Sequence, residues 1–219
     1  MKNKFDYERF RCAIFDLDGT LINSTGVWER VDIEFLGKRG IEVPPDFVKT
    51  IKTHNFATGS EYVAKRFNLP ETPEQIAAEW FDMASEAYAD EIVLKDGAKE
   101  FLLKLKDSGY ALAVATASDR ALYEPCLKRN GIYDLFDVFT QSDEVERGKG
   151  FPDVYELAAR RCGCDVLSCV VFEDVAEAVR GALMGGFYTV GVRDEASRAD
   201  EQYIRDNCSL FINDYYELL

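Results

Sequence analysis

The chain has 219 residues, of which 47% are hydrophobic and 30% charged, a composition typical of a globular protein with a hydrophobic core. Its formal net charge of −14 argues against a nucleic-acid partner, because contacts with phosphate backbones need clustered Lys and Arg. No hydrophobic run reaches the length of a membrane span and no N-terminal leader is recognisable, so we expect a cytoplasmic protein without a membrane partner, whose six cysteines are reduced.

The first part of the chain predicts one strand followed only by helices. Residues 11–16 form a hydrophobic run that ends in Asp16 and predicts a buried strand. Thr72, Pro73 and Gln75 mark the start of a helix through an N-cap, a proline at the first helical position and a capping box. Hydrophobic residues recur at helical spacing in four runs. The first begins at about residue 27, and the other three cover about 46–54, 60–67 and 73–89.

From about residue 92 onward, helices and strands alternate. Ser118 or Asp119 is expected to cap one of these helices. Continuous hydrophobic strands that alternate with helices predict an α/β fold with a doubly wound, mainly parallel, Rossmann-like sheet. The expected core is residues 1–23 and 94–219, and residues 24–93 form an inserted, all-helical cap. The predicted strands are 110–116, 137–140, 168–172, 187–192 and 209–212, and the predicted helices are 98–108, about 119–130, 152–161 and 175–184.

Two carboxylates stand where the first strand ends. Ligands of such sheets bind at the carboxyl ends of the strands, and Asp16 and Asp18 occupy that place. A buried carboxylate needs a partner, which a metal ion with a phosphoryl group would supply. Asp-x-Asp also opens calcium-binding loops, but the sixth position of such a loop is glycine and here it is Leu21.

Other polar residues stand at or near later strand ends. Thr116 ends a buried strand and Ala117 begins the turn after it, where a hydroxyl and backbone N–H groups can hold a phosphoryl oxygen. Lys149 lies between two glycines ahead of a helix; without its surroundings it would be interpreted as a solvated loop residue. Glu173 and Asp174 offer the hard oxygen ligands that Mg²⁺ prefers, and they are also suited to capping the next helix.

These residues, in this order, resemble the four motifs of the haloacid dehalogenase-like hydrolases. The resemblance covers nearly the whole chain and is closest to the subgroup with a helical cap after the first motif, which includes phosphoglycolate phosphatase and β-phosphoglucomutase. It implies a phosphatase that acts on a small phosphorylated metabolite through an aspartyl-phosphate. Asp16 would be the nucleophile, and Asp18 the acid and base, its pKa raised with help from the neighbouring Asp16.

The resemblance also implies a cofactor and its ligands. Asp16, the backbone carbonyl of Asp18, Glu173 and Asp174 would bind Mg²⁺. Thr116, Ala117 and Lys149 would hold the phosphoryl group, with Lys149 also among the catalytic residues. Many relatives carry Ser or Thr after the acidic pair and Gly further on, whereas this chain has Val175 and Glu177, so the arrangement around the metal is expected to differ.

Two alternative functions remain open from the sequence. One is a β-phosphoglucomutase-like phosphosugar mutase, but the histidine of that pattern is missing from residues 23–30. The other is a non-catalytic protein that binds a phosphorylated metabolite for regulation. The dehalogenase branch lacks the second aspartate of the first motif, so Asp18 argues against it.

Substrate choice is expected to depend on the inserted helices. Candidates for contact with the leaving group are Lys52, His54, Asn55 and Arg66. The aromatic residues of the following helix, including Tyr88, are interpreted as packing residues of the cap. We expect a monomer or a weak homo-oligomer.

Overall fold

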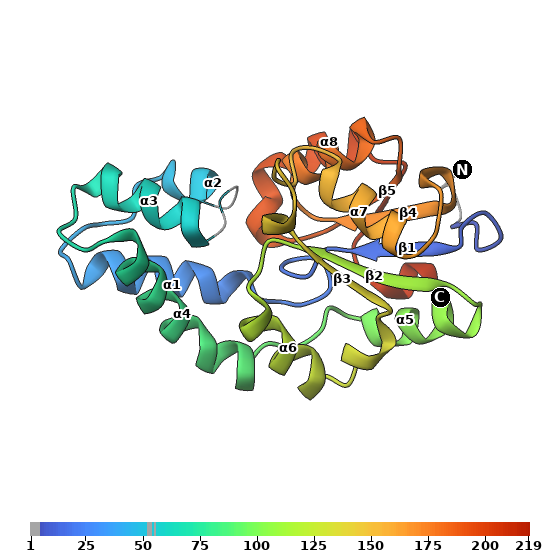
Figure 1. The fold of residues 1–219 in the computed structure, drawn as a ribbon, viewed down its shortest axis with the longest axis horizontal. Helices are drawn as coiled ribbons and strands as arrows, with labels where there is room; N and C mark the ends of the chain where they lie inside the picture. Colours follow the sequence, from blue (N-terminus) through green and yellow to red (C-terminus); the bar gives the residue numbers. More distant parts are fainter. Residues whose placement is uncertain (1–4, 52–53, 55) are drawn as a thin grey trace.

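The computed structural model of the protein describes residues 5–51, 54 and 56–219. Within these residues the strands form one parallel sheet in the order β3-β2-β1-β4-β5-β6 (Figure 1). This confirms the predicted doubly wound α/β fold. The strands are β1 (Cys12–Phe15), β2 (Ala111–Thr116), β3 (Val138–Gln141), β4 (Cys169–Glu173), β5 (Tyr188–Val192) and β6 (Leu210–Ile212).

Strand β1 lies in the middle of the sheet, between β2 and β4. Every residue of β1 and β4 is buried, as expected for strands covered on both faces. In the parallel register Phe15 stands beside Val114 of β2 and Phe172 of β4, and the Asp16 amide donates to the Phe172 carbonyl at 3.1 Å. The carboxyl ends of three neighbouring strands therefore meet at one edge.

Helices cover both faces of the sheet. On one face α5 (Ala98–Asp107) and α6 (Arg120–Arg129) pack with the C-terminal Tyr215. On the other face α7 (Asp153–Arg161) and α8 (Ala176–Met184) pack against residues such as Ile14 and Val171. Alternate residues of β1 belong to different core clusters, because successive side chains of a strand point to opposite faces.

The chain between β1 and α5 folds as helices α1 (Thr25–Gly37), α2 (Phe47–Ile51), α3 (Phe56–Phe67) and α4 (Pro73–Asp90), which we call the helical insertion. It lies at one end of the molecule (Figure 1). The predicted capping box is present, because the Gln75 amide donates to Thr72 Oγ1 and the Gln75 side chain accepts from the Thr72 amide.

Two segments connect the helical insertion to the rest of the protein, which we call the sheet part, and these segments run side by side. Ile22 and Leu94 form an antiparallel bridge, and the Asn23 amide donates to the Val93 carbonyl at 2.9 Å. The Lys95 amide donates to the Leu21 carbonyl at 2.9 Å. These hydrogen bonds hold together the two connections of the helical insertion.

Some element boundaries differ from the prediction. Helix α3 begins at Phe56 rather than residue 60. Helix α2 ends at Ile51, and the predicted continuation to 54 includes residues 52 and 53, which lie outside the described residues. Helix α9 (Glu201–Asn207) was not predicted, because it buries little apart from Ile204 and so has no hydrophobic periodicity.

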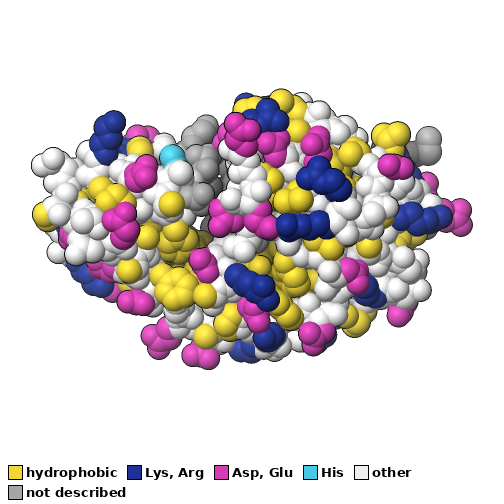
Figure 2. All heavy atoms as spheres, in the orientation of Figure 1, with side chains coloured by type: hydrophobic (Ala, Val, Ile, Leu, Met, Phe, Trp, Pro, Cys, Tyr) yellow, Lys and Arg dark blue, Asp and Glu magenta, His cyan; other side chains and the backbone are white. Residues whose placement is uncertain are grey.

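The surface is predominantly acidic, as the net charge of −14 requires. Figure 2 shows Asp and Glu side chains over both the helical insertion and the sheet part, interspersed with Lys and Arg. Among the described residues no helix is both long and apolar enough to span a lipid bilayer. Within the described residues the cysteines form no disulfide, and that they are reduced stays an expectation.

Candidate functional site

Three carboxylates converge at the carboxyl edge of the sheet. Asp16 follows β1, Glu173 ends β4 and Asp174 comes directly after it. All three are buried, and an oxygen atom of each lies within 4.8 Å of one from the others. The parallel register brings them together, because it aligns the ends of β1 and β4.

Lys149 contacts two of these three carboxylates. Its Nζ is 2.5 Å from Asp16 Oδ1 and 2.5 Å from Glu173 Oε1. The backbone of this segment packs closely on α8, where a Cβ on Gly181 would stand 2.1 Å from the Lys149 carbonyl oxygen. Glycine at position 181 therefore permits the approach that places the lysine, a role that sequence analysis missed.

The charges of the cluster do not balance. Burial lowers the pKa of Lys149, but the negative charges of Asp16 and Glu173 outweigh this effect and raise it, so the amine is protonated. Burial raises the pKa of Glu173 to about 7 against the opposing effect of Lys149. Burial, followed by Asp16, raises the pKa of Asp174 well above its ordinary value. If all three carboxylates are ionised, one lysine leaves an excess of negative charge. The raised pKa values of Glu173 and Asp174 express the cost of that excess, which bound protons or a bound cation would relieve.

Asp174 is held by side chains from two other segments. Thr20 Oγ1 donates to Asp174 Oδ1 at 2.9 Å, and Ser197 Oγ donates to Oδ2 at 3.4 Å. Gly19 has a φ of +86°, and a Cβ there would stand 2.4 Å from Asp174 Oδ2. The glycine of the first motif is therefore needed both for its backbone conformation and for the space that the carboxylate occupies.

Glu173 has one satisfied oxygen and one without a partner. The Tyr155 hydroxyl of α7 donates to Glu173 Oε1 at 2.7 Å, on the oxygen that also contacts Lys149. Glu173 Oε2 is buried and makes no hydrogen bond within the described part of the chain. A buried carboxylate oxygen without a donor is costly, so this atom is suited to a cation that the protein itself does not supply.

Asp18, two residues after Asp16, has hydrogen-bond partners of its own outside the carboxylate cluster. Its Oδ1 accepts a hydrogen bond from Ser24 Oγ at 2.6 Å and another from the Tyr88 hydroxyl of α4. Burial raises the pKa of Asp18 more than the expected repulsion by Asp16 does, while the hydrogen bonds from Ser24 and Tyr88 lower it. The contact with Tyr88 was missed because the two residues are 70 positions apart.

The end of β2 forms a tight turn beside the cluster. Thr116 is fully buried and its Oγ1 accepts a hydrogen bond from the Ser118 amide at 3.0 Å, while Ala117 is exposed. Of the two predicted caps of α6, Asp119 is the correct one, since its side chain accepts from the Ala121 amide at 2.8 Å. The buried Ser118 hydroxyl lies beside Asp18 and Tyr88 and lowers the pKa of both, although its geometry within the described residues is short of a regular hydrogen bond.

The predicted specificity residues of the helical insertion are only partly described. Lys52 and Asn55 lie outside the described residues. The His54 ring stacks on Tyr62 with centroids 5.4 Å apart. Arg66 binds Asp46 with a 2.8 Å contact and also hydrogen-bonds Tyr62. Among the described residues no hydrogen bond, ion pair or ring contact joins His54 or Arg66 to the carboxylate cluster, and their role in specificity stays a prediction.

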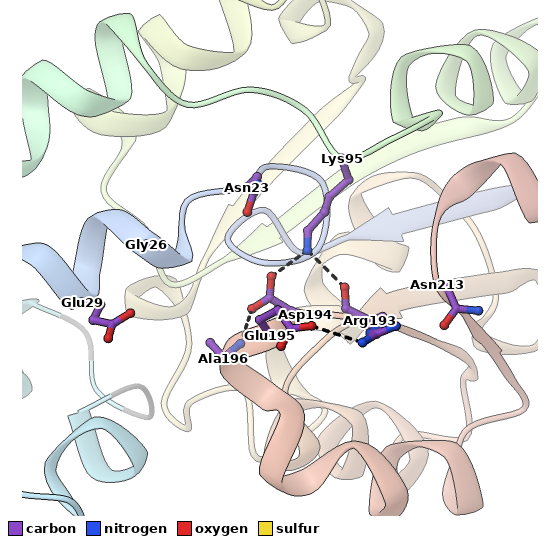
Figure 3. Close-up of a pocket in the computed structure, with 9 residues that line it drawn as sticks. All are labelled: Asn23, Gly26, Glu29, Lys95, Arg193, Asp194, Glu195, Ala196 and Asn213. Atoms are coloured by element: carbon purple, nitrogen blue, oxygen red, sulfur yellow. Dashed lines mark hydrogen bonds and ion pairs between the residues drawn. The ribbon is translucent and has the colours of Figure 1, made fainter.

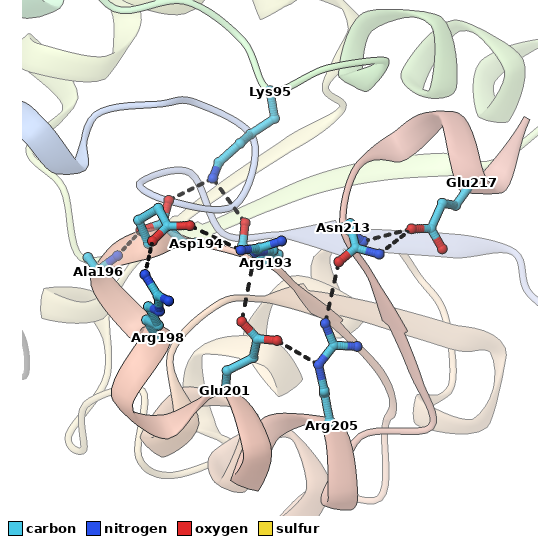
Figure 4. A network of polar contacts seen from close by, with 10 residues as sticks. Lys95, Arg193, Asp194, Ala196, Arg198, Glu201, Arg205, Asn213 and Glu217 are labelled. Carbon is cyan, nitrogen blue, oxygen red and sulfur yellow. Dashed lines mark hydrogen bonds and ion pairs between the residues drawn. The ribbon is translucent and has the colours of Figure 1, made fainter.

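A network of polar contacts joins the loop after β5 to the segment that connects the helical insertion to α5 (Figures 3 and 4). Lys95 Nζ lies 2.6 Å from Asp194 Oδ2 and donates to the Arg193 carbonyl at 3.1 Å. Asp194 Oδ1 accepts from the Ala196 amide, one residue before Ser197, which contacts Asp174. Lys95 and the loop 193–196 also line a cavity of about 420 Å³.

Comparison with known proteins gives consistent results. Residues 10–186 match the haloacid dehalogenase-like hydrolase family. The chain is 30% identical over 182 residues to a bifunctional riboflavin kinase/FMN phosphatase from Arabidopsis thaliana, in a match that covers 83% of this chain and 48% of that protein. The chain therefore spans about half the length of that curated relative.

Two further matches cover most of this chain and nearly all of the protein to which it is compared. The fructose-1-phosphate phosphatase YqaB of Escherichia coli strain K12 is 28% identical over 192 residues, with 85% of this chain and 98% of that protein covered. The crystal structure of CbbY from Rhodobacter sphaeroides in complex with phosphate superposes with a TM-score of 0.82 at 23% identity, over 95% of this chain and 96% of that chain. Since the family match covers most of the chain, this protein belongs to the haloacid dehalogenase-like hydrolases.

Proposed function

We propose that this protein is a Mg²⁺-dependent phosphatase that hydrolyses a small phosphorylated metabolite through an aspartyl-phosphate on Asp16. The observation that carries the proposal is the position of the Asp16 carboxylate, buried at a strand end, 2.5 Å from the Lys149 ammonium and beside two further carboxylates. Such a cluster suits a ligand that brings both a cation and an anionic group.

The residues of the site support two chemical steps. In the first, an Asp16 carboxylate oxygen forms a bond to phosphorus while the bond to the leaving oxygen breaks, and protonated Asp18 donates its proton to that oxygen. In the second, Asp18 takes a proton from a water molecule whose oxygen attacks phosphorus, and the bond to Asp16 breaks. The raised pKa of Asp18 favours its protonated form at the start of the first step.

The donor set fits a divalent cation. Asp16, Glu173 and Asp174 present oxygens close together, Glu173 Oε2 has no other partner in the described chain, and a single lysine contacts the cluster, so a bound cation would let all three carboxylates ionise. We propose that these three carboxylates, with the backbone carbonyl of Asp18, hold Mg²⁺, which prefers oxygen ligands. When bound, the cation would offset negative charge on the carboxylates and on the phosphoryl oxygens.

The phosphoryl group would be held between β2 and Lys149. Thr116 Oγ1 already accepts from the Ser118 amide, so its hydroxyl proton is available to donate to a phosphoryl oxygen. The exposed Ala117 offers its backbone N–H at the same turn. Lys149 would contact both the nucleophile and the phosphoryl group, which explains why a buried ammonium is placed at this point.

For the substrate class, we propose a phosphate ester of a sugar or polyol, since relatives are named as phosphatases of fructose 1-phosphate and of hexitols. We further propose that residues 1–23 and 94–219 act as the catalytic core and residues 24–93 as the cap that selects the leaving group. His54 and Arg66, with Lys52 and Asn55, are the proposed specificity residues of that cap.

The test is a screen of phosphorylated sugars, polyols and carboxylates with the wild type and with Asp16→Asn, each in Mg²⁺ and in excess chelator. The wild type with Mg²⁺ should release phosphate from at least one compound, and Asp16→Asn should be slower by at least about a thousandfold, because the nucleophile is lost. Equal release by both proteins would exclude Asp16 as nucleophile. Full turnover in excess chelator would exclude the metal requirement, and binding without turnover would favour a regulatory protein.

A further inference from the structure

We infer that Tyr88 of the helical insertion, oriented by Trp28, is the positioning residue of the Asp18 carboxyl group. The inference rests on the proposed function, because it assigns Tyr88 to the acid of that reaction. It starts from a hydrogen-bonded chain that crosses from the insertion to the sheet part, in which Trp28 Nε1 donates to the Tyr88 hydroxyl at 2.9 Å and Tyr88 donates to Asp18 Oδ1.

The direction of this chain is determined by its first member. The indole N–H of Trp28 is only a donor, so the Tyr88 oxygen must accept from it. The single hydroxyl proton of Tyr88 is therefore directed at Asp18. Tyr88 is fully buried, so water does not compete for this proton, and its ring lies 6.0 Å from that of Trp28 in an edge contact.

Ser24 supplies a second donor to the same oxygen. Ser24 occupies the N-cap position of α1, yet its side chain makes no capping hydrogen bond, because its hydroxyl is bonded to Asp18 Oδ1 at 2.6 Å. A helix whose N-cap side chain makes no capping hydrogen bond loses stability. The insertion thus gives up local helix stability to place a donor on Asp18, as expected if the orientation of this carboxyl group matters.

Both donors lie on Oδ1, which makes Oδ1 the accepting oxygen. The carboxyl plane is then oriented by Ser24 and Tyr88, and Oδ2 is the oxygen to which neither of them donates. The two donors come from α4 and from the start of α1, so the position of the helical insertion on the sheet decides whether Asp18 is held in this orientation. Proton donation to the leaving oxygen depends on such positioning.

The experiment compares two substrates that differ mainly in the basicity of the leaving oxygen. Phenyl phosphate needs proton donation as its phosphorus–oxygen bond breaks, and p-nitrophenyl phosphate needs it far less. The measured quantity is the ratio of kcat/KM for phenyl phosphate to kcat/KM for p-nitrophenyl phosphate, in the holoenzyme with Mg²⁺. Partial unfolding lowers both values equally and leaves the ratio unchanged, so the ratio reports on proton donation.

Tyr88→Phe, which keeps the ring and removes the hydroxyl, should lower this ratio by about tenfold to a hundredfold, within the contribution expected from general acid catalysis. Tyr110→Phe is the matched control, because it also removes a buried hydroxyl, one that donates to the Tyr7 carbonyl at 2.8 Å at the opposite end of β2. The control should keep the wild-type ratio. An unchanged ratio in Tyr88→Phe would overturn the inference.

Two further variants separate this inference from the proposed function. Asp18→Asn should lower the ratio at least as much as Tyr88→Phe, and an unchanged ratio there would refute Asp18 as the acid and with it the proposed mechanism. Trp28→Phe should lower the ratio less than Tyr88→Phe, and adding it to Tyr88→Phe should cause no further loss, because Trp28 acts through Tyr88. Fully multiplicative losses would overturn the role of Trp28.

Discussion

At the residue scale, the site is an arrangement of carboxylates whose burial is made tolerable by a few specific donors. Lys149 contacts Asp16 and Glu173, Thr20 donates to Asp174, and Tyr155 donates to Glu173. Each donor is placed by a different segment, and one ammonium cannot balance three ionised carboxylates. A substitution that moves one of these oxygens should therefore weaken cation binding before it affects other properties of the site.

Gly19→Ala should disturb cation binding through Asp174. Alanine at a φ of +86° is strained, and its Cβ would meet Asp174 Oδ2 at 2.4 Å. We expect a loss of about 1–2 kcal/mol in the free energy of unfolding, together with the loss of most of the thermal stabilisation that Mg²⁺ gives the wild type.

Gly40→Ala provides the matched control for this substitution. Gly40 also has a positive φ, of +70°, but a Cβ there would meet no described atom within 4 Å. It should cost about the same in strain and keep the full Mg²⁺-dependent shift in melting temperature. A full shift in Gly19→Ala would contradict the assignment of Asp174 as a metal ligand.

At the element scale, helix α1 carries two features that do not serve its own stability. Its N-cap Ser24 is bonded to Asp18 instead of the helix, and its inward face, formed by residues such as Val31 and Phe35, also contains Asp32. Asp32 is only 8% exposed. A carboxylate on a packing face opposes the amphipathic pattern that otherwise holds α1 against the rest of the insertion.

Asp32→Asn should stabilise the protein at neutral and alkaline pH. Burial, followed by Glu29, raises the pKa of Asp32 from 3.8 to about 7. The folded state therefore binds a proton more tightly than the unfolded state, and stability falls as pH rises from about 4 to about 7. The substitution should raise the free energy of unfolding by about 1–3 kcal/mol at pH 8 and have little effect near pH 4.

Urea unfolding at several pH values measures this difference. Glu34→Gln is the control on the same helix, since the Glu34 side chain is 61% exposed and pairs with Lys38 at the surface. Its effect should stay below about 0.5 kcal/mol at every pH. If Asp32→Asn were equally neutral at pH 8, Asp32 would be solvated or paired in solution.

At the scale of the whole molecule, the sheet order places β1 in the centre, and the helical insertion lies at one end of the molecule, beyond the strands. The insertion contacts the sheet part at Asp18 through Tyr88 and at its two connections, where Lys95 binds Asp194. The connecting segment that contains Lys95 contacts the loop after β5, and Ser197 of the same loop donates a hydrogen bond to Asp174. The placement of the insertion and the shape of the carboxylate site are therefore linked.

Lys95→Met should destabilise the molecule as a whole. The Lys95 and Asp194 side chains are 16% and 3% exposed, so the substitution leaves a buried carboxylate without its ammonium partner. We expect a loss of about 3 kcal/mol in the free energy of unfolding, measured in urea. Arg30→Met, which breaks a pair with Glu91 whose side chains are 61% and 56% exposed, should cost less than about 1 kcal/mol. Equal losses would show that the Lys95 pair is solvated.

The sequence predicted most of the fold because its signals are local. The hydrophobic run before Asp16 and the capping box at Thr72 each depend on residues close together in the chain, and both appear where expected. Helix α9 was missed because a short, charged helix that buries mainly Ile204 lacks such a pattern. Ser118 was a plausible cap, but the cap is Asp119, a choice made by the turn after β2.

By itself the sequence determined that Asp16, Thr116 and Glu173 end parallel strands, and hence that they share one edge of the sheet, since parallel strands align their carboxyl ends. Only the tertiary structure decided which side chains contact these residues and their neighbours. Tyr88 reaches Asp18 across 70 positions and Tyr155 reaches Glu173 across 18. The physical reason is that local spacing determines secondary structure, whereas the partner of a buried carboxylate depends on how distant elements pack.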